Sequence, residues 1–258
     1  MITIPEVDFI IILLIFLRIF SAFVSSPVYS HKAVPVLVKI FLSIIISYIV
    51  FLTLDKSKII VETNLGWLFT NAMTEIFTGL LIGFMLNFVF YGISFAGSLI
   101  GFNMGLSMAE ALNPVDGFSN NIIGNLLSMA SLVLFILING HQYIISGLFY
   151  SFSVIHIGKN TFTDSAFQLL IRYSSGIFII AVKIASPFIV SYFLVYIAEG
   201  IMARVIPQMQ VFFVSQPIML GLGFTLLAIL VPIYFYVIKY LLGGYENNLA
   251  SLIKAMGQ

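Results

Sequence analysis

The sequence contains no cysteine in 258 residues. Without a thiol the chain cannot form disulfides, thiolate nucleophiles, cysteine-based zinc sites or iron–sulfur clusters. The three histidines, His31, His141 and His156, do not have the spacing of a metal site. We therefore expect neither a metal site nor a cofactor.

Charged residues are also scarce, because Asp, Glu, Lys and Arg make up 8% of the chain against 61% hydrophobic residues. Soluble domains usually carry about 25% charged residues. The formal net charge of +1 is too small and too dispersed for the basic stripe with which proteins bind phosphate backbones. This composition excludes a soluble globular protein, and it excludes nucleic acid as the main partner. It predicts an integral membrane protein whose exterior faces lipid or other apolar protein.

Two hydrophobic runs open the chain. Phe9–Ser30 has Arg18 as its one charge, and Val36–Leu54 holds only Lys39. Since about 20 helical residues cross the hydrocarbon layer, each run predicts a membrane span. The next piece, Leu65–Glu75, mixes aromatic residues with Asn and Thr, which is typical of the membrane interface. We expect it to lie flat or to begin a helix obliquely.

The remaining hydrophobic runs are longer than an ordinary bilayer needs. Asn139–Gly140 is a turn signal that would fold one of them into a helical hairpin. Prolines in another favour kinks or breaks, because proline lacks the backbone donor of a helix. Hydropathy indicates about six spans, or up to eight with the hairpin. The four runs are Ile76–Ala109, Gly117–Gly158, Phe167–Ala198 and Val205–Ile238, and the prolines are Pro207, Pro217 and Pro232.

These interruptions predict much irregular backbone at membrane depth. An unpaired backbone amide or carbonyl in hydrocarbon costs several kcal/mol, so such chain survives only inside protein or beside a watery cavity. The predicted fold class is therefore an all-α integral membrane protein of one domain, residues 1–258. Its broken helices and helical hairpins would pack into an assembly.

Small residues recur at four-residue spacing, at Gly97, Gly101 and Gly105, and earlier at Gly79 and Gly83. This spacing puts them on one helical face, where another backbone can approach closely. The face could join this chain to another subunit of an assembly, or pack two helices of the same chain together. Both interpretations remain open at this point.

The segment from Gly105 to Gly117 joins two apolar runs. It contains Asn113–Pro114, which ends helices, and Asp116–Gly117, a turn pair. As an exposed connection its acidic residues would simply be solvated, whereas in a conduit it could act as a lid with methionines as a deformable seal. The candidate gate residues are Gly105, Met108, Glu110, Asn113, Pro114, Asp116 and Gly117.

Lys183 lies within an apolar run. A lysine near the middle of a span costs about 2.5 to 3.5 kcal/mol on insertion scales, so it should have a partner or water. It could belong to an ion or proton path, or form a structural salt bridge, for example to Glu199. We favour the structural role, because a proton relay would need further acids in the membrane.

Enzyme chemistry finds little support. The sequence has no Gly-rich phosphate loop, no His-Glu metal motif and no plausible Ser-His-Asp set. We therefore assign no catalytic, cofactor-binding or metal-ligating residue. A secondary transporter whose broken helices bind a small solute near Lys183 is an alternative, although the breaks do not recur at matching places in two halves.

Two motifs resemble the FliR family of bacterial flagellar export-gate proteins. One is Gly101-Phe-Asn-Met-Gly-Leu-Ser-Met-Ala followed by Asn113-Pro-Val-Asp-Gly117 and Asn139-Gly-His141. The other is Pro207-Gln-Met-Gln-Val-Phe-Phe-Val214 followed by Pro217. The likeness covers essentially the whole chain. Where that family often has Gly after the Val-Phe-Phe-Val run, this chain has Ser215-Gln216.

The resemblance implies a non-enzymatic component of the type III secretion apparatus in the bacterial inner membrane, at the flagellar basal body. One such subunit would assemble with several copies of FliP and FliQ and would be linked to FlhB and FlhA. Unfolded export substrates would pass through the assembly, and lipid would cover part of it. The injectisome homologues share this architecture and remain an alternative.

The resemblance also implies positions for functional segments. Family members place a loop in the closed pore as a plug, and the matching positions are about Leu106 to Phe118. The run Val211–Pro217 would contact neighbouring subunits. The residues that we assign to helix packing or subunit interfaces are Gly97, Gly101, Pro207, Met209, Phe212, Phe213 and Pro217.

Overall fold

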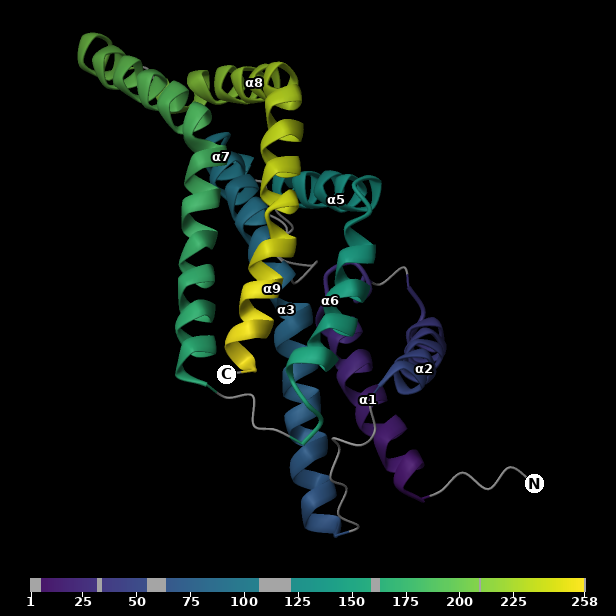
Figure 1. The fold of residues 1–258 in the computed structure, drawn as a ribbon. Coiled ribbons are helices and arrows are strands. Elements are labelled where there is room, and N and C mark those ends of the chain that lie inside the picture. Colours follow the sequence, from purple (N-terminus) through teal and green to yellow (C-terminus); the bar gives the residue numbers. More distant parts are fainter. Residues whose placement is uncertain are drawn as a thin grey trace. The chain divides into compact units, whose positions relative to one another are not determined.

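A computed structural model describes residues 6–31, 34–54, 64–106, 122–158, 163–208 and 210–257, and these ranges contain helices and no strand. The prediction of an all-α protein is confirmed. In chain order the helices are α1 (Glu6–Ser25), α2 (Val36–Thr53), α3 (Leu65–Asn103), α5 (Ile122–Leu137), α6 (Gly140–Val154), α7 (Asp164–Val205), α8 (Val211–Gly243) and α9 (Tyr245–Met256) (Figure 1).

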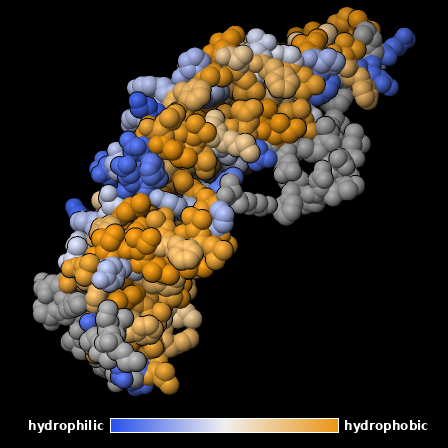
Figure 2. Space-filling view, turned by 90° about the vertical axis from the view of Figure 1, so that its right-hand side faces the viewer, coloured by the Kyte–Doolittle hydropathy of each residue, from blue (hydrophilic) through white to orange (hydrophobic). Residues whose placement is uncertain are grey.

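The helices are long and apolar enough for a multi-pass membrane protein. Five segments of the described chain could each cross a membrane, and α5 with α6 could form a sixth span. This agrees with the prediction of about six. Hydrophobic residues also dominate the face seen in Figure 2, as expected for a surface that meets lipid or apolar protein.

Local sequence explains where the first helices begin and end. Glu6 and Asp8 lie in the first turn of α1, where negative charge stabilises a helix through its interaction with the helix dipole. The helix ends at Ser25, two residues before Pro27 and earlier than the hydrophobic run itself. Helix α2 begins directly after Pro35, whose ring fixes a backbone angle suited to a helix start.

Helix α3 decides between the two expectations for Leu65–Glu75. The segment begins a helix, because it forms the first turns of α3, and it is not a separate interfacial piece. This helix has 39 residues. At 1.5 Å per residue it is about 58 Å long, more than the hydrocarbon layer requires.

Less backbone is irregular than we expected. Pro187 lies inside α7, and Pro217 and Pro232 lie inside α8, and none of them ends its helix. At Pro187 a side chain replaces the missing backbone donor, because Ser186 Oγ donates to the carbonyl of Lys183 at 2.9 Å. The expected breaks at Pro207 and at Asn139 are confirmed. Asn139 separates α5 from α6 with a left-handed φ of 59°.

The helices group into two compact units. Unit 1 contains Met1–Phe88, Asn139–Ser174 and Gly243–Gln258, and unit 2 contains Val89–Ile138 and Ser175–Leu242. Helices α3 and α7 each contribute residues to both units. Both units are therefore built from parts of the sequence that lie far apart.

In unit 1, α1 packs against α2 and α6 packs against α9. Glycines on α3 allow its close approach to α1. A Cβ at Gly79 would overlap the carbonyl of Arg18, and a Cβ at Gly83 would overlap the carbonyl of Ala22. One turn later, Asn87 Nδ2 donates to the carbonyl of Ser25 at 2.6 Å. Because both numbers rise together along this contact, α1 and this part of α3 run in the same direction.

In unit 2, two tyrosines join α7 to α8 in reciprocal fashion. Tyr192 on α7 donates its hydroxyl hydrogen to the carbonyl of Met219 on α8 at 2.8 Å. Tyr234 on α8 donates to the carbonyl of Ile184 on α7 at 3.2 Å. All four residues are buried. Each phenol thus satisfies its own donor while linking two helices, as buried tyrosines usually do.

Candidate functional site

The candidate gate begins at the end of α3. The structure describes Gly105 and Leu106 of this segment. The other predicted gate residues, Met108, Glu110, Asn113, Pro114, Asp116 and Gly117, lie outside the described residues.

The chain leaves α3 through a left-handed turn. Gly105 has φ +78°, a conformation that glycine adopts without strain and that commonly ends helices. Its amide donates to the carbonyl of Phe102 at 3.0 Å, and the amide of Met104 donates to Ile100 at 2.9 Å. The carbonyl of Met104 accepts a hydrogen bond from the side-chain amide of Gln216 at 3.1 Å. That donor comes from α8, 112 residues further along the chain.

The side chain of Met104 is also held by α8. Met104 is 0% exposed. It lies against Gly223, where an added Cβ would meet Met104 Cγ at 2.6 Å and would also overlap the hydroxyl of Tyr192. Gly223 belongs to a stripe of α8 whose buried members Ser215, Met219 and Gly223 follow each other at four-residue spacing, and Gln216 lies next to Ser215 in the sequence.

The second motif forms the first turns of α8. Its helix begins at Val211, and Phe213 is 69% exposed. Pro207 and Pro217 are exposed as well. Met209 and the side chain of Phe212 lie outside the described residues. Val211 is half-buried and the other described apolar members of this motif are exposed, and their assignment to a subunit interface stays a prediction.

Two of the predicted packing glycines lie on α3 within unit 2. A Cβ at Gly97 would overlap the backbone of Gly124 on α5. The small size of Gly97 thus serves packing within this chain, one of the two roles that the sequence left open. Gly101, one turn later, is buried.

Lys183 is exposed on α7. The expected salt bridge to Glu199 is not formed. Both residues lie on the same uninterrupted helix, which at 1.5 Å per residue separates them by about 24 Å along its axis. The role of Lys183 stays a prediction.

A buried ion pair in unit 1 is the main feature that the sequence analysis missed. Arg18 Nε on α1 lies 2.5 Å from Glu75 Oε2 on α3, and the two side chains are 0% and 1% exposed. Each residue is a charge next to apolar sequence, and this was the signal that either residue needs a partner. The sequence did not indicate that they pair with each other, because they are 57 positions apart.

Arg18 also ties α6 to this pair. Its Nη1 donates to Ser151 Oγ at 3.3 Å and to the carbonyl of Ile155 at 3.2 Å. Its guanidinium carbon lies 4.2 Å from the ring centroid of Phe152. Ile155 caps the C-terminal end of α6, where positive charge is favourable. One side chain therefore fixes α1, α3 and α6 of unit 1 to each other.

Tyr29, between α1 and α2, adds a contact to the start of α6. Its hydroxyl donates to the carbonyl of His141 at 3.3 Å, and its ring packs on Phe23 at 4.4 Å between centroids. Burial raises the pKa of Tyr29 to about 12, because the low-dielectric surroundings disfavour the phenolate. The hydroxyl therefore stays protonated and remains a donor at neutral pH.

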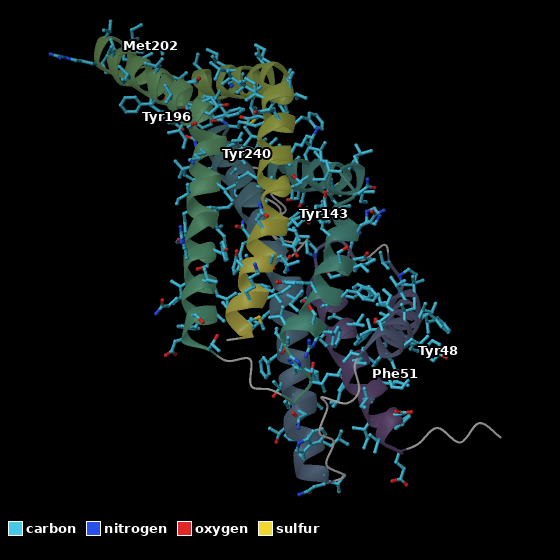
Figure 3. All side chains as sticks on the ribbon, in the orientation of Figure 1. Tyr48, Phe51, Tyr143, Tyr196, Met202 and Tyr240 are labelled. Carbon is cyan, nitrogen blue, oxygen red and sulfur yellow. The ribbon has the colours of Figure 1, made fainter. Side chains whose placement is uncertain are left out.

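Apolar side chains cover the outward faces of α7 and α8 in unit 2. In an 18-residue apolar stretch of α7 28% of the residues are buried, and in such a stretch of Phe213–Met256 17%, against 61% in one of α3. Figure 3 labels Tyr196 and Met202 on α7 and Tyr240 on α8, which are 42%, 43% and 75% exposed. Such faces require lipid or further apolar protein around them.

The described residues contain no group of three or more His, Cys, Asp or Glu side chains that could hold a metal ion. The site residues instead act through hydrogen bonds, helix ends and apolar contact.

Comparison with known proteins finds one family along almost the whole chain. The family model described as "Bacterial export proteins, family 1" matches residues 9–244. The chain is 30% identical over 248 residues to the flagellar biosynthetic protein FliR of Bacillus subtilis (strain 168), covering 95% of each chain. It is also 30% identical to FliR of Escherichia coli (strain K12) over 93% of this chain and 91% of the relative. FliR of Aquifex aeolicus (strain VF5) is 24% identical over 93% of this chain and 97% of its own.

Proposed function

Because the chain belongs to the FliR family of bacterial export proteins and is a membrane subunit of the flagellar export apparatus, we propose that it forms and gates the export channel. The role is structural rather than enzymatic. The subunit builds part of the channel wall, and the segment Gly105–Gly117 closes the channel at rest. Unfolded flagellar subunits pass through when it opens.

The observation that carries this proposal is the set of exposed apolar faces on α7 and α8, on a chain whose relatives are flagellar export proteins. A channel wall needs sides that fit neighbouring subunits. We propose FliP and FliQ as these neighbours, with FlhB and FlhA joined to the same gate. The assembly would lie in the bacterial inner membrane at the flagellar basal body, with lipid around it.

The flagellar role is favoured over an injectisome role, because the reported relatives are flagellar biosynthetic proteins. A solute transporter is disfavoured for the same reason. Purification separates a transporter from a channel subunit. A transporter would be stable alone in detergent, whereas a channel subunit would need its neighbours. Mild solubilisation of the native membrane should therefore yield this chain together with FliP and FliQ, and a well-behaved monomer with solute uptake would overturn the proposal.

Deletion of Asn113–Gly117 tests the gate. The assembled channel should form but should leak small ions, because the segment that closes it is shortened. Ion permeability of vesicles with the purified assembly is the measurement. An equally long deletion of Lys56–Ile60, in the charged connection after the second span, is the control and should leave permeability unchanged. A tight membrane with the shortened segment in a normal assembly would disprove the gating role.

A further inference from the structure

Gln216 stands at the point where the candidate gate leaves the helical part of the chain. Helix α3 ends at Asn103, and the amides of Met104 and Gly105 donate to its carbonyls at Ile100 and Phe102. The carbonyl of Met104 obtains its donor from Gln216 on α8. Met104 is 0% exposed, and a polar group away from water is stabilised by a hydrogen bond, so this bond favours the position in which Met104 meets α8.

Gly105 permits this bond in two ways. Its φ of +78° is a conformation that other residues adopt only with strain. An added Cβ would also overlap the side-chain amide of Gln216. The turn and the hydrogen bond therefore depend on the same residue.

A second contact fixes Met104 to the same helix. Its side chain lies against Gly223, two turns beyond Gln216 along α8, beside the hydroxyl of Tyr192. That hydroxyl is itself bonded to the carbonyl of Met219. Met104 is thus held at its backbone by one residue of α8 and at its side chain by another. Two points of attachment fix both the position and the direction of the chain at this residue.

We propose that Gln216 is a positioning residue for the gate: its amide anchors the carbonyl of Met104 and so fixes the position and direction of the chain at Gly105, the first residue of the gate. This inference rests on the gating role proposed above. Gln216 needs no contact with export substrates for this task. It transmits any shift in the first turns of α8 directly to the start of the gate.

Substitution Gln216→Leu removes the donor and keeps a similar volume. In the assembled channel it should raise ion leak about fivefold, the population change that corresponds to one lost hydrogen bond. The yield of assembled channel should not change. Gly105→Ala should raise the leak further, since it adds strain at φ +78° and displaces the amide. Gln168→Leu, an identical change at an exposed position of α7, is the control and should have no effect.

A second measurement does not depend on gating. Because the chain has no cysteine, Leu106→Cys provides a single site for a nitroxide label in the full assembly. The label should become more mobile with Gln216→Leu and stay unchanged with Gln168→Leu. Unchanged mobility would overturn the anchoring role, whatever the leak. If the Asn113–Gly117 deletion does not leak while mobility rises as expected, the gating proposal fails and the anchor stands. If that deletion leaks and Gln216→Leu neither leaks nor changes mobility, the anchor fails alone.

Discussion

The two units of this chain solve the same problem, the burial of polar groups in an apolar protein, by different means. Among the described residues the buried charged side chains belong to unit 1, and so do the buried serine, threonine and asparagine side chains except Ser131 and Ser215. Unit 1 centres on a full charge pair, whereas unit 2 is joined by neutral hydroxyl and amide groups that bond to backbone carbonyls.

The two units also differ in how many hydrophobic side chains they expose. Unit 2 holds the larger share of the exposed large hydrophobic side chains, most of them on α7 and α8. A region that meets partners or lipid on several sides needs an apolar exterior and few fixed charges. A region that fixes several helices of one chain can use a buried charge, because a charge without its partner is strongly penalised there. The helix arrangement of unit 1 therefore depends on its own buried ion pair, whereas that of unit 2 depends more on the lipid or protein that covers its apolar faces.

The largest expected effect is on unit 1. Arg18→Met leaves Glu75 buried without its partner, which should cost about 3 to 5 kcal/mol. The amount of chain in the membrane and the melting temperature of the purified assembly should both fall. The control Arg204→Met changes an exposed arginine of α7 and should have little effect. Adding Glu75→Leu to Arg18→Met should restore much of the loss, and a double variant as unstable as the single one would refute the charge-pair explanation.

A smaller effect is expected in unit 2. Tyr192→Phe removes the hydrogen bond to Met219 and should cost about 0.5 to 1.5 kcal/mol, since the donor and acceptor are neutral. Tyr234→Phe should cost less, because its bond to Ile184 is longer, 3.2 Å against 2.8 Å. Thermal unfolding of the assembly measures both. Tyr240→Phe, at a tyrosine that is 75% exposed, provides the baseline. Equal costs at positions 192 and 240 would show that the reciprocal bonds contribute nothing.

The smallest effect is expected at Lys183. This residue is exposed on α7, so Lys183→Met should change stability by less than about 0.5 kcal/mol and should leave secretion intact. Export of flagellar subunits and recovery of the assembly are the two measurements. Loss of export with normal assembly would instead favour a proton path through unit 2. Unit 2 would then also contain a charge with a specific role, and the contrast between the two units would be weaker.

Composition and hydropathy were sufficient for the fold class. A chain with 8% charged residues has to be a membrane protein, and the first two runs match α1 and α2 closely. The turn at Asn139 also followed from local sequence, since Asn adopts left-handed backbone more readily than other residues with a Cβ. These features depend on residues that are neighbours in the sequence.

Prolines were less informative. Pro217 and Pro232 favoured kinks or breaks in α8. Neither proline ends the helix, although α8 is sharply bent along its length (Figure 1). In water a missing donor favours a break, but in an apolar environment the alternative to the helix is more unpaired backbone, so the helix persists. Ser186, which bonds to the carbonyl that Pro187 leaves without a donor, shows how a neighbouring hydroxyl supports this.

Contacts across long sequence separations could not be predicted. Arg18 with Glu75, and Gln216 with Met104, meet only after folding. Periodicity places each residue on a face of its helix, but it does not tell which other helix packs against that face. The sequence therefore directed attention to Lys183, which has the same apparent cost as Arg18 but lies on an exposed face.

The order of synthesis adds a constraint to the Arg18 cluster. Arg18 leaves the ribosome 57 residues before Glu75 and 133 residues before Ser151. At about 5 to 20 residues per second, the guanidinium waits roughly 3 to 11 seconds for its carboxylate. During that interval the first helix carries an uncompensated charge, so its final packing in unit 1 follows the synthesis of the third helix.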